Sequence, residues 1–347
     1  MKGRQVVLGR IFGAEAAALM VDGQLEDILI ATDRVTPLPP GAICRGVTDR
    51  LMKGQGGAFL RLPDGQTGYL RDRKGVPEGK PVLVQIAGVA DEGKAIPVST
   101  RLLFRGRAAL VTPGAPGVNV SRQIREDETR DHLTTLGQSV LGDRSHGVII
   151  RSIADQLDDD DITAELAQLL DLADGIMAEG QGDPELLLDA PGPWEQAWME
   201  WGDPAPDAID EGDHSFDDHG VTDAIEALLS SQIPLPGGGS AVIEATRALI
   251  AVDVNTGSDT SPAAALKANI AVARDLPRQL RLRGLGGQVV IDFAPMPKRD
   301  RATLDQVLRA SFRGDGTETT LIGWTAMGLY ELNRKRDRVA LSLLAGA

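Results

Sequence analysis

The chain has 347 residues, 42% of them hydrophobic and 25% charged, which excludes a fibrous or wholly disordered protein and is enough for two or three hydrophobic cores. Its formal net charge is −14, but residues 153–226 hold 23 Asp and Glu and no Lys or Arg, so the rest of the chain carries about +9. No apolar run reaches the roughly 18 residues of a membrane span, so we expect a cytoplasmic protein, and the single cysteine excludes an intrachain disulfide or a cysteine-rich zinc site.

The first hundred residues predict β-structure. The runs VVLGRIF and EDILIAT, with the turn sequence VDGQ, indicate an opening β-hairpin. From Pro39 to Thr100, five short strand-like runs follow, separated by Gly, Pro and Asp turns. This spacing is typical of a small barrel of the OB kind. We expect Cys44 to be a buried residue at the start of its first strand.

Two aromatic residues stand out in the predicted barrel, because only 3% of the chain is aromatic. Phe59 and Tyr69 fall on successive strands, and OB barrels bind single-stranded nucleic acid by stacking bases on such rings. An equally good interpretation is that the rings fill the barrel core. Lys94, in the turn DEGKAI, would add a phosphate contact if it lies on the same face.

The acidic segment divides into two parts. DQLDDDDITAELAQLLDLADGIMAEG predicts an amphipathic helix, with Asp158–Asp161 capping its start and facing water rather than binding a cation. PGPWEQAWMEWGDPAPDAIDEGDHSFDDHG is rich in Pro, Gly and Asp and predicts a partly mobile surface excursion. A further hypothesis is that the acidic segment covers the basic remainder as an RNA mimic.

The chain from about Ile233 alternates strands and helices. We expect strands in SAVIEA, ALIAVDVN, GQVVIDF, TTLIGW and GLYELNRKR, a helix that ends at Gly284, and another over residues 299–313. This order predicts an α/β layer structure with a largely buried sheet. The run Gly237–Gly239 lacks the rest of a phosphate-binding motif and predicts a turn.

Two aspartates end apolar strands in this part, Asp253 in AVDVN and Asp292 in VVIDF. Two such strand ends side by side would make a site for Mg²⁺, and Asn255 points to the same face of its strand as Asp253. Such a cation would polarise a phosphodiester and activate water. The alternative is that each aspartate caps the following helix, which the sequence VNTGSDTSP makes credible for Asp253.

Basic residues flank these strands and together predict a site for a polyanion. They are Arg278, Arg281, Arg283, Lys298, Arg299, Arg301, Arg334, Lys335, Arg336 and Arg338.

Three stretches in this order resemble the catalytic part of the ribonuclease E/G family: IPLPGGGSAVIEATRALIAVDVNTG, ARDLPRQLRLRGLGGQVVIDFAPM and GLYELNRKR. The resemblance extends through GAICRGVTD, GGAFLRLP, GKAIPVSTR, VTPGAPGVNVSRQI and HGVIIRS. It implies an α+β and α/β protein of several subdomains. These are a hairpin of a reduced ribonuclease-H-like scaffold (1–37), an OB-fold RNA-binding domain (38–100), a 5′-sensor-like region with the acidic helix (101–195), an acidic segment with the rest of the scaffold (196–232) and a DNase-I-like catalytic subdomain (233–347).

The resemblance also implies an activity and its residues. Asp253 and Asp292 match the metal-binding catalytic pair and Asn255 the asparagine that assists them, with Mg²⁺ as cofactor and Mn²⁺ as a substitute. The expected reaction is hydrolysis of single-stranded RNA to 5′-phosphate and 3′-hydroxyl ends, in RNA processing or decay. Phe59, Tyr69 and Lys94 match RNA contacts of the barrel. Residues matching a pocket that senses a 5′-monophosphate are Gly106, Arg122, Arg151 and Ser152.

Departures from the family pattern limit these expectations. The zinc-linking Cys-Pro-x-Cys motif is missing, so we expect no zinc and no zinc-linked dimer, but a monomer or a dimer through another surface. Pro295-Met296 replaces the usual Asp-Met, and Glu318 or Thr319 falls where the family has a sensor arginine, which puts 5′-end sensing in doubt. The alternative to an endoribonuclease is a non-catalytic RNA-binding or regulatory protein of the same family.

Overall fold

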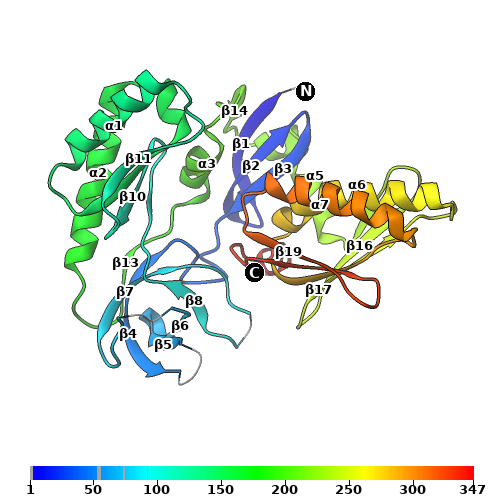
Figure 1. The fold of residues 1–347 in the computed structure, drawn as a ribbon, viewed down its shortest axis with the longest axis horizontal. Coiled ribbons are helices and arrows are strands. Elements are labelled where there is room, and N and C mark those ends of the chain that lie inside the picture. The colour runs from blue at the N-terminus through cyan, green and yellow to red at the C-terminus, as the bar shows by residue number, and fades with distance from the viewer. Residues whose placement is uncertain (1–2, 53–55, 73–74, 92) are drawn as a thin grey trace. The chain divides into compact units, whose positions relative to one another are not determined.

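The computed structural model describes residues 3–52, 56–72, 75–91 and 93–347 (Figure 1). The chain divides into two units. In the described ranges no helix combines the length and the apolar character needed to cross a membrane. The first unit comprises Met1–Leu8, Glu15–Ala17 and Leu29–Asp210, and the second comprises Gly9–Ala14, Ala18–Ile28 and Glu211–Ala347.

The amino-terminal residues form three strands in succession: β1 (Arg4–Ile11), β2 (Ala14–Val21) and β3 (Gln24–Ile30). The predicted two-stranded hairpin is therefore wrong, because the VDGQ turn joins β2 to β3 and the alanine-rich β2 separates the two predicted strands. Both turns use positive φ angles at two successive residues, as tight β-hairpin turns require. Strand β14 (Ala208–Asp210) pairs in parallel with β1, with Gln5 opposite Ala208.

The predicted barrel is confirmed as a closed five-stranded barrel. Strand β4 pairs with both β5 and β7, and β8 joins β6 to β7. Cys44 lies in its core, where burial, with a smaller effect of Asp189, raises the pKa of the thiol to about 12. The strands are β4 (Ile43–Leu51), β5 (Ala58–Arg61), β6 (Thr67–Leu70), β7 (Pro81–Ile86) and β8 (Ile96–Ser99), with the 3-10 turn η1 (Pro63–Gly65), and β13 (Glu185–Leu188) pairs with β4.

A four-stranded sheet follows, covered by α1 (Asp127–Leu141) and α2 (Asp159–Ala178). Its strand order is β11 (Gly117–Val120), β12 (His146–Ile150), β10 (Ala109–Pro113) and β9 (Phe104–Arg105), and the 3-10 turn η2 (Ser152–Gln156) follows β12.

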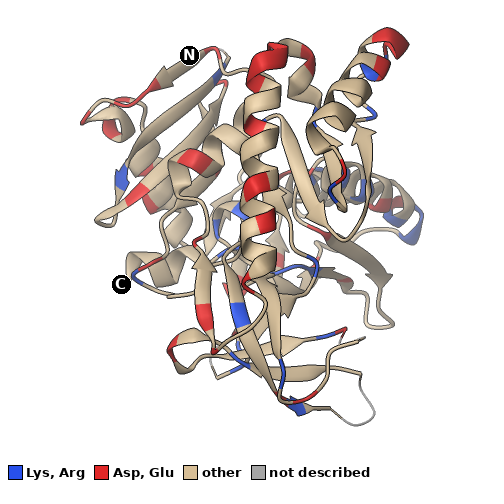
Figure 2. Cartoon of the chain, turned by 90° about the vertical axis from the view of Figure 1, so that its left-hand side faces the viewer, with Lys and Arg blue, Asp and Glu red and all other residues tan. Residues whose placement is uncertain are grey.

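Helix α2 confirms the predicted acidic helix. Its residues 158–161 are exposed, but the N-cap residue Asp158 makes no side-chain capping hydrogen bond, so that detail was wrong. Figure 2 shows acidic residues spaced along the long vertical helix. Its apolar side is part of the core, with Ile162, Leu166 and Leu170 all 0% exposed. The acidic helix is therefore part of a hydrophobic core through its apolar side, and the hypothesis that the acidic segment acts as an RNA mimic stays a prediction.

The second acidic stretch is ordered rather than a surface excursion. Trp201 and Phe216 are each 4% exposed, and the indole of Trp194 donates a hydrogen bond of 3.0 Å to the Ala16 carbonyl. Buried aromatic side chains explain why this polar stretch folds. Its helices are α3 (Pro193–Trp201) and α4 (Ser215–Asp218), and α5 (Val221–Leu229) follows it directly.

The remaining residues form a six-stranded mixed sheet with α6 (Pro262–Leu282) and α7 (Arg301–Arg313). Within this sheet only β17 and β18 are parallel, because α6 connects them. The strand order is β15 (Gln232–Pro234), β16 (Ser240–Ala245), β17 (Ile250–Asn255), β18 (Gly287–Asp292), β20 (Tyr330–Arg334) and β19 (Thr319–Trp324), and η3 (Lys298–Asp300) and α8 (Leu341–Ala345) complete the part.

One face of this sheet is buried and the other is open. Val252 and Ile291 pack with residues of α6 and α7, whereas Asp253, Asn255 and Asp292 are exposed. The predicted strands and helices are confirmed, but the expectation of a largely buried sheet is wrong. Apolar and polar residues alternate along β17 and β18, and the polar residues line the open face.

Candidate active site and RNA-binding residues

The two candidate catalytic aspartates lie directly opposite each other. Asp253 on β17 and Asp292 on β18 are register partners in the parallel pair. Both side chains are exposed on the open face of the sheet. Because neighbouring strands are about 4.8 Å apart, two carboxylates in register can approach one cation.

Asn255 interacts with the first of these aspartates. Its side-chain amide donates a hydrogen bond of 2.6 Å to Oδ2 of Asp253. The alternative in which the aspartates cap helices does not hold. Helix α6 is capped by Ser261, whose hydroxyl accepts a hydrogen bond from the Ala264 amide, and η3 begins after Pro297.

Asn269 is a positioning residue that sequence reasoning missed. It is 0% exposed on α6. Its side-chain amide donates to the Ala294 carbonyl, and its side-chain oxygen accepts from the Ala294 amide, both at 2.9 Å. These two bonds fix the backbone two residues beyond Asp292. An asparagine within the apolar stripe of a predicted helix was the signal that could have identified it.

A glycine turn packs against the end of β17. Gly237 and Gly238 have φ angles of 88° and 84°, which confirms the predicted turn between β15 and β16. A Cβ atom on Gly239 would lie 2.6 Å from the Asn255 carbonyl oxygen. Glycine is therefore required for the turn to approach this strand end.

The chemistry of the donors suits a hard divalent cation. Magnesium commonly binds through one or two carboxylates and completes its coordination with water and phosphate oxygens. Across the described part of the chain no group of three or more His, Cys, Asp and Glu side chains is placed to hold a metal. Two carboxylates alone would leave the remaining coordination positions of such an ion to water and phosphate oxygens.

The two aromatic residues of the barrel form a pair on its outer surface. Phe59 and Tyr69 are register partners on β5 and β6, and their ring centroids are 5.4 Å apart. Their strand neighbours Leu60 and Leu70 are buried in the barrel. The interpretation that the rings fill the core is therefore wrong. A Cβ atom on Gly57 would lie 2.5 Å from the Tyr69 hydroxyl, so glycine leaves room for this ring.

Arg50 extends this aromatic pair and was also missed. Its guanidinium lies 5.0 Å from the centroid of the Phe59 ring, a cation–π contact. The signal that could have identified Arg50 is its position on β4, where it is the register partner of Phe59 on β5. Lys94 lies in the turn before β8, the strand that pairs with β6, and forms an ion pair of 2.6 Å with Asp91.

The four residues predicted to sense a 5′-monophosphate follow the ends of strands β9, β11 and β12 in the sheet that α2 covers. Arg151 donates to the Gly106 carbonyl at 2.8 Å, and Ser152 donates to Asp203 at 2.6 Å. Arg122 is exposed and lies two residues after Val120, which is paired with Ile150 beside Arg151. Their role in sensing stays a prediction.

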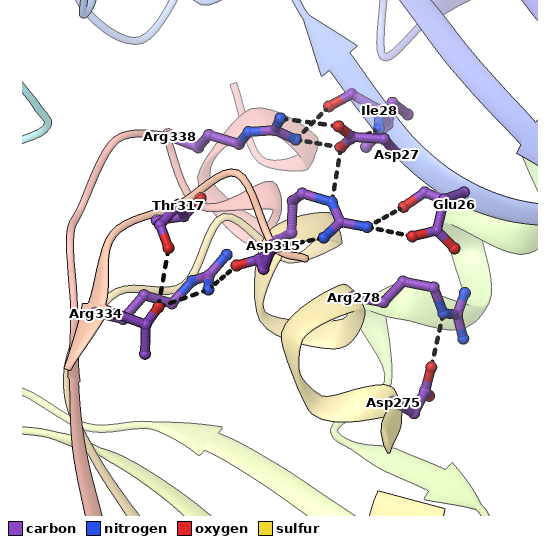
Figure 3. A network of polar contacts seen from close by, with 11 residues as sticks. Glu26, Asp27, Ile28, Asp275, Arg278, Asp315, Thr317, Arg334 and Arg338 are labelled. Atoms are coloured by element: carbon purple, nitrogen blue, oxygen red, sulfur yellow. Dashed lines mark hydrogen bonds and ion pairs between the residues drawn. The ribbon is translucent and has the colours of Figure 1, made fainter. Parts of the chain in front are cut away.

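Most of the arginines predicted to bind a polyanion instead make internal bonds (Figure 3). Arg281 bonds to Glu26 and Asp315, and Arg334 bonds to the same Asp315. Burial explains this difference, because a buried cation requires a partner. The others are Arg278 with Asp275 and the Leu25 carbonyl, Arg283 with the Leu228 carbonyl and Arg338 with Asp27.

Of the predicted cations, Lys335 stays exposed directly after β20, and two more stay exposed in the connection after Asp292. Lys298 and Arg299 are exposed in η3. Arg301 begins α7 with its guanidinium 4.3 Å from the Trp324 ring centroid. Lys298, Arg299 and Lys335, rather than the buried arginines, are therefore accessible to a phosphate.

Comparisons with known proteins identify relatives of this chain. A model of the ribonuclease E/G family matches residues 104–210 and 205–337. Ribonuclease E of Nostoc sp. is 27% identical over 93% of this chain and 54% of its own length, and ribonuclease G of Salmonella typhimurium is 27% identical over 76% and 61%. A chloroplastic ribonuclease E/G-like protein of Arabidopsis thaliana is 33% identical over 46% of this chain and 17% of its own length.

Each match covers a larger share of this chain than of the relative's own length. The chain spans between about half and two thirds of the length of the first two relatives, ribonucleases E and G. The family match includes both Asp253 and Asp292 as well as the sheet covered by α2. This chain therefore belongs to the ribonuclease E/G family.

Proposed function

We propose that this chain is a Mg²⁺-dependent endoribonuclease that hydrolyses single-stranded RNA to 5′-phosphate and 3′-hydroxyl ends, in RNA processing or decay. The observation that carries the proposal is the register of Asp253 with Asp292 on the open face of the sheet. Two opposed, exposed carboxylates suit metal-assisted phosphodiester hydrolysis. Mn²⁺ is the expected substitute ion. We also assign the six-stranded sheet to a DNase-I-like subdomain and β1–β3 to a reduced ribonuclease-H-like scaffold.

The roles of the site residues follow from their contacts. Asp253 and Asp292 would hold the metal ion, which when bound polarises the phosphodiester and lowers the pKa of a water molecule. Asn255 fixes one oxygen of Asp253 and so orients the other. Asn269 keeps the backbone after Asp292 in place. Preorganised carboxylates lose little entropy when metal and substrate bind.

The barrel supplies the affinity for single strands in this proposal. Bases stack on Phe59 and Tyr69, whose rings lie outside the barrel core. Arg50 lies against Phe59, and Lys94 lies in the turn before β8, the strand paired with β6; we assign to both a contact with the phosphates of a stacked strand. Stacking on rings is tolerant of sequence, so the proposal does not require a strict recognition motif.

Cleavage of a fluorescent single-stranded oligoribonucleotide tests the proposal. We expect cutting that needs Mg²⁺ and falls by at least about 100-fold in Asp253→Asn and Asp292→Asn, because each removes a charge from the metal site. Glu244→Gln is the matched control. It removes a carboxylate exposed on β16, the strand paired with β17, and should cut normally.

The alternative function has a different signature. A non-catalytic RNA-binding protein would bind the oligoribonucleotide through the barrel and release it uncut at every Mg²⁺ concentration. Retained cutting in Asp253→Asn or Asp292→Asn would also overturn the proposed site, even if the chain is a nuclease.

A further inference from the structure

A carboxylate lies in a concavity of backbone amides beside Gly106. Glu165, on the acidic helix α2, accepts hydrogen bonds from the amides of Arg107 at 3.1 Å, Ala108 at 2.8 Å and Ala109 at 3.1 Å. Three convergent backbone amides form an anion-binding nest. In this chain the anion is one of its own side chains.

Gly106 makes the close approach of this carboxylate feasible. A Cβ atom at that position would lie 2.2 Å from Oε1 of Glu165. The carbonyl of Gly106 accepts the hydrogen bond from Arg151, so the guanidinium lies at the edge of the same nest. The glutamate, the glycine and the arginine thus form one packed arrangement rather than an open pocket.

Further carboxylates compensate the charge of the arginine. Burial and the neighbouring Arg105 lower the pKa of Arg151, whereas Glu165, Glu200 and Asp203 act in the opposite direction. Asp203 also accepts the hydrogen bond of the Ser152 hydroxyl. An added phosphate dianion would meet these negative charges and would compete with Glu165 for the amides, and both effects oppose its binding.

We infer that the Glu165 carboxylate occupies this nest in the place of an RNA 5′-monophosphate. The chain then cuts RNA at a rate that does not depend on whether the 5′ end carries a phosphate. The inference rests on the proposed function and changes its substrate range. Internal sites in 5′-hydroxylated or circular RNA are then cut with the same kcat/KM as sites near a phosphorylated end. Glu165 is a specificity-determining residue in this view, and it does not touch the scissile bond.

The test compares two oligoribonucleotides of one sequence, one with a 5′-monophosphate and one with a 5′-hydroxyl. For the wild type we expect kcat/KM values within about twofold of each other. Glu165→Ala empties the nest, and charge-assisted bonds to phosphate should then raise the preference for the phosphorylated RNA about tenfold. Glu165→Gln, which keeps the size of the side chain, should raise it less.

Asp160→Ala is the matched control. It removes the same charge from the exposed first turn of α2 and should leave the ratio at one. A wild-type preference of tenfold or more for the phosphorylated RNA would overturn the inference, as would a ratio that stays at one in Glu165→Ala.

A binding measurement separates this inference from the proposed nuclease activity. If neither RNA is cut, the proposed function fails, but fluorescence anisotropy still compares the affinities of the two oligoribonucleotides. Equal affinities for the wild type and a gain for the phosphorylated RNA in Glu165→Ala support the inference. Tighter binding of phosphorylated RNA by the wild type contradicts it.

Discussion

Arg334 donates a hydrogen bond to Asp315 inside the second unit, and both side chains are 1% exposed. Arg281 bonds to the other oxygen of the same carboxylate. Asp315→Asn removes the counter-charge of the buried Arg334 and one of the counter-charges of Arg281, which keeps Glu26. We expect the free energy of unfolding, measured with urea, to fall by about 3–5 kcal/mol. Arg309→Gln, which breaks an exposed pair on α7, should leave the urea midpoint unchanged, and an equal effect of both would contradict the assignment.

The pH dependence of stability should report on Asp27. Burial favours its neutral form, but Arg338 and Arg281 outweigh burial, so the pKa of the carboxyl lies below the usual 3.8. A depressed pKa stabilises the fold fully above pH 3.8 and loses this contribution as the pH falls through the lower, folded value. We expect the difference in unfolding free energy between the wild type and Asp27→Asn to be constant from pH 7 to 5 and to shrink below pH 4. A difference that grows on acidification would refute this.

Removal of either half-buried ring of the Phe59–Tyr69 pair should weaken binding of single-stranded RNA. Stacking contributes about 1–3 kcal/mol per base, so Phe59→Ala or Tyr69→Ala should raise the Kd about 5- to 150-fold. The thermal transition should change little, because both rings lie outside the barrel core. Tyr69→Phe keeps the ring and should bind normally. A loss of binding in Tyr69→Phe would show that the hydroxyl, rather than stacking, is needed.

Salt dependence of RNA binding should distinguish accessible cations from buried ones. Lys298 and Arg299 are exposed in η3, six and seven residues after Asp292. Loss of each phosphate contact should reduce the slope of log Kobs against log salt by about 0.7. Lys298→Gln and Arg299→Gln together should therefore flatten the slope. Arg247→Gln, at the turn before β17, is the control, and a flatter slope in that variant would point to a non-specific charge effect.

Asn269→Ala should slow catalysis without weakening RNA binding. The change removes both hydrogen bonds to Ala294 and leaves buried backbone groups unpaired, which costs about 1–3 kcal/mol of stability. Asp292 then loses its fixed position, so we expect kcat to fall while the Kd for RNA stays constant. A lower affinity with unchanged kcat would assign Asn269 to substrate binding instead.

The sequence predicted the elements that have strong local signals. The barrel strands, α2, α6, α7 and strands β16 to β20 follow from periodicity and from Gly, Pro and Asp turns. The aspartates at the ends of β17 and β18 were placed side by side on the same grounds, and the structure puts them in register. Their roles in metal binding and cleavage stay predictions.

Other features depend on contacts that no local pattern reveals. Strand β2 was missed because its run of alanines carries little β-propensity. Arg281 and Arg334 look like a nucleic-acid surface in sequence, since Glu26 and Asp315 lie far away along the chain. Glu165 likewise appears as one more solvated charge on an acidic helix until the amides of residues 107–109 are placed beside it.

The parallel pairing of β1 with β14 has a consequence for synthesis. On one edge of β1, residues 5–7 pair with residues 208–210, and Asp27 meets its counter-ions at Arg281 and Arg338. Chains fold as they emerge from the ribosome, so until about residue 210 is synthesised one edge of β1 lacks its partner strand, and both counter-ions of Asp27 are synthesised later still. Nascent chains of intermediate length should therefore bind chaperones more strongly than the finished protein does.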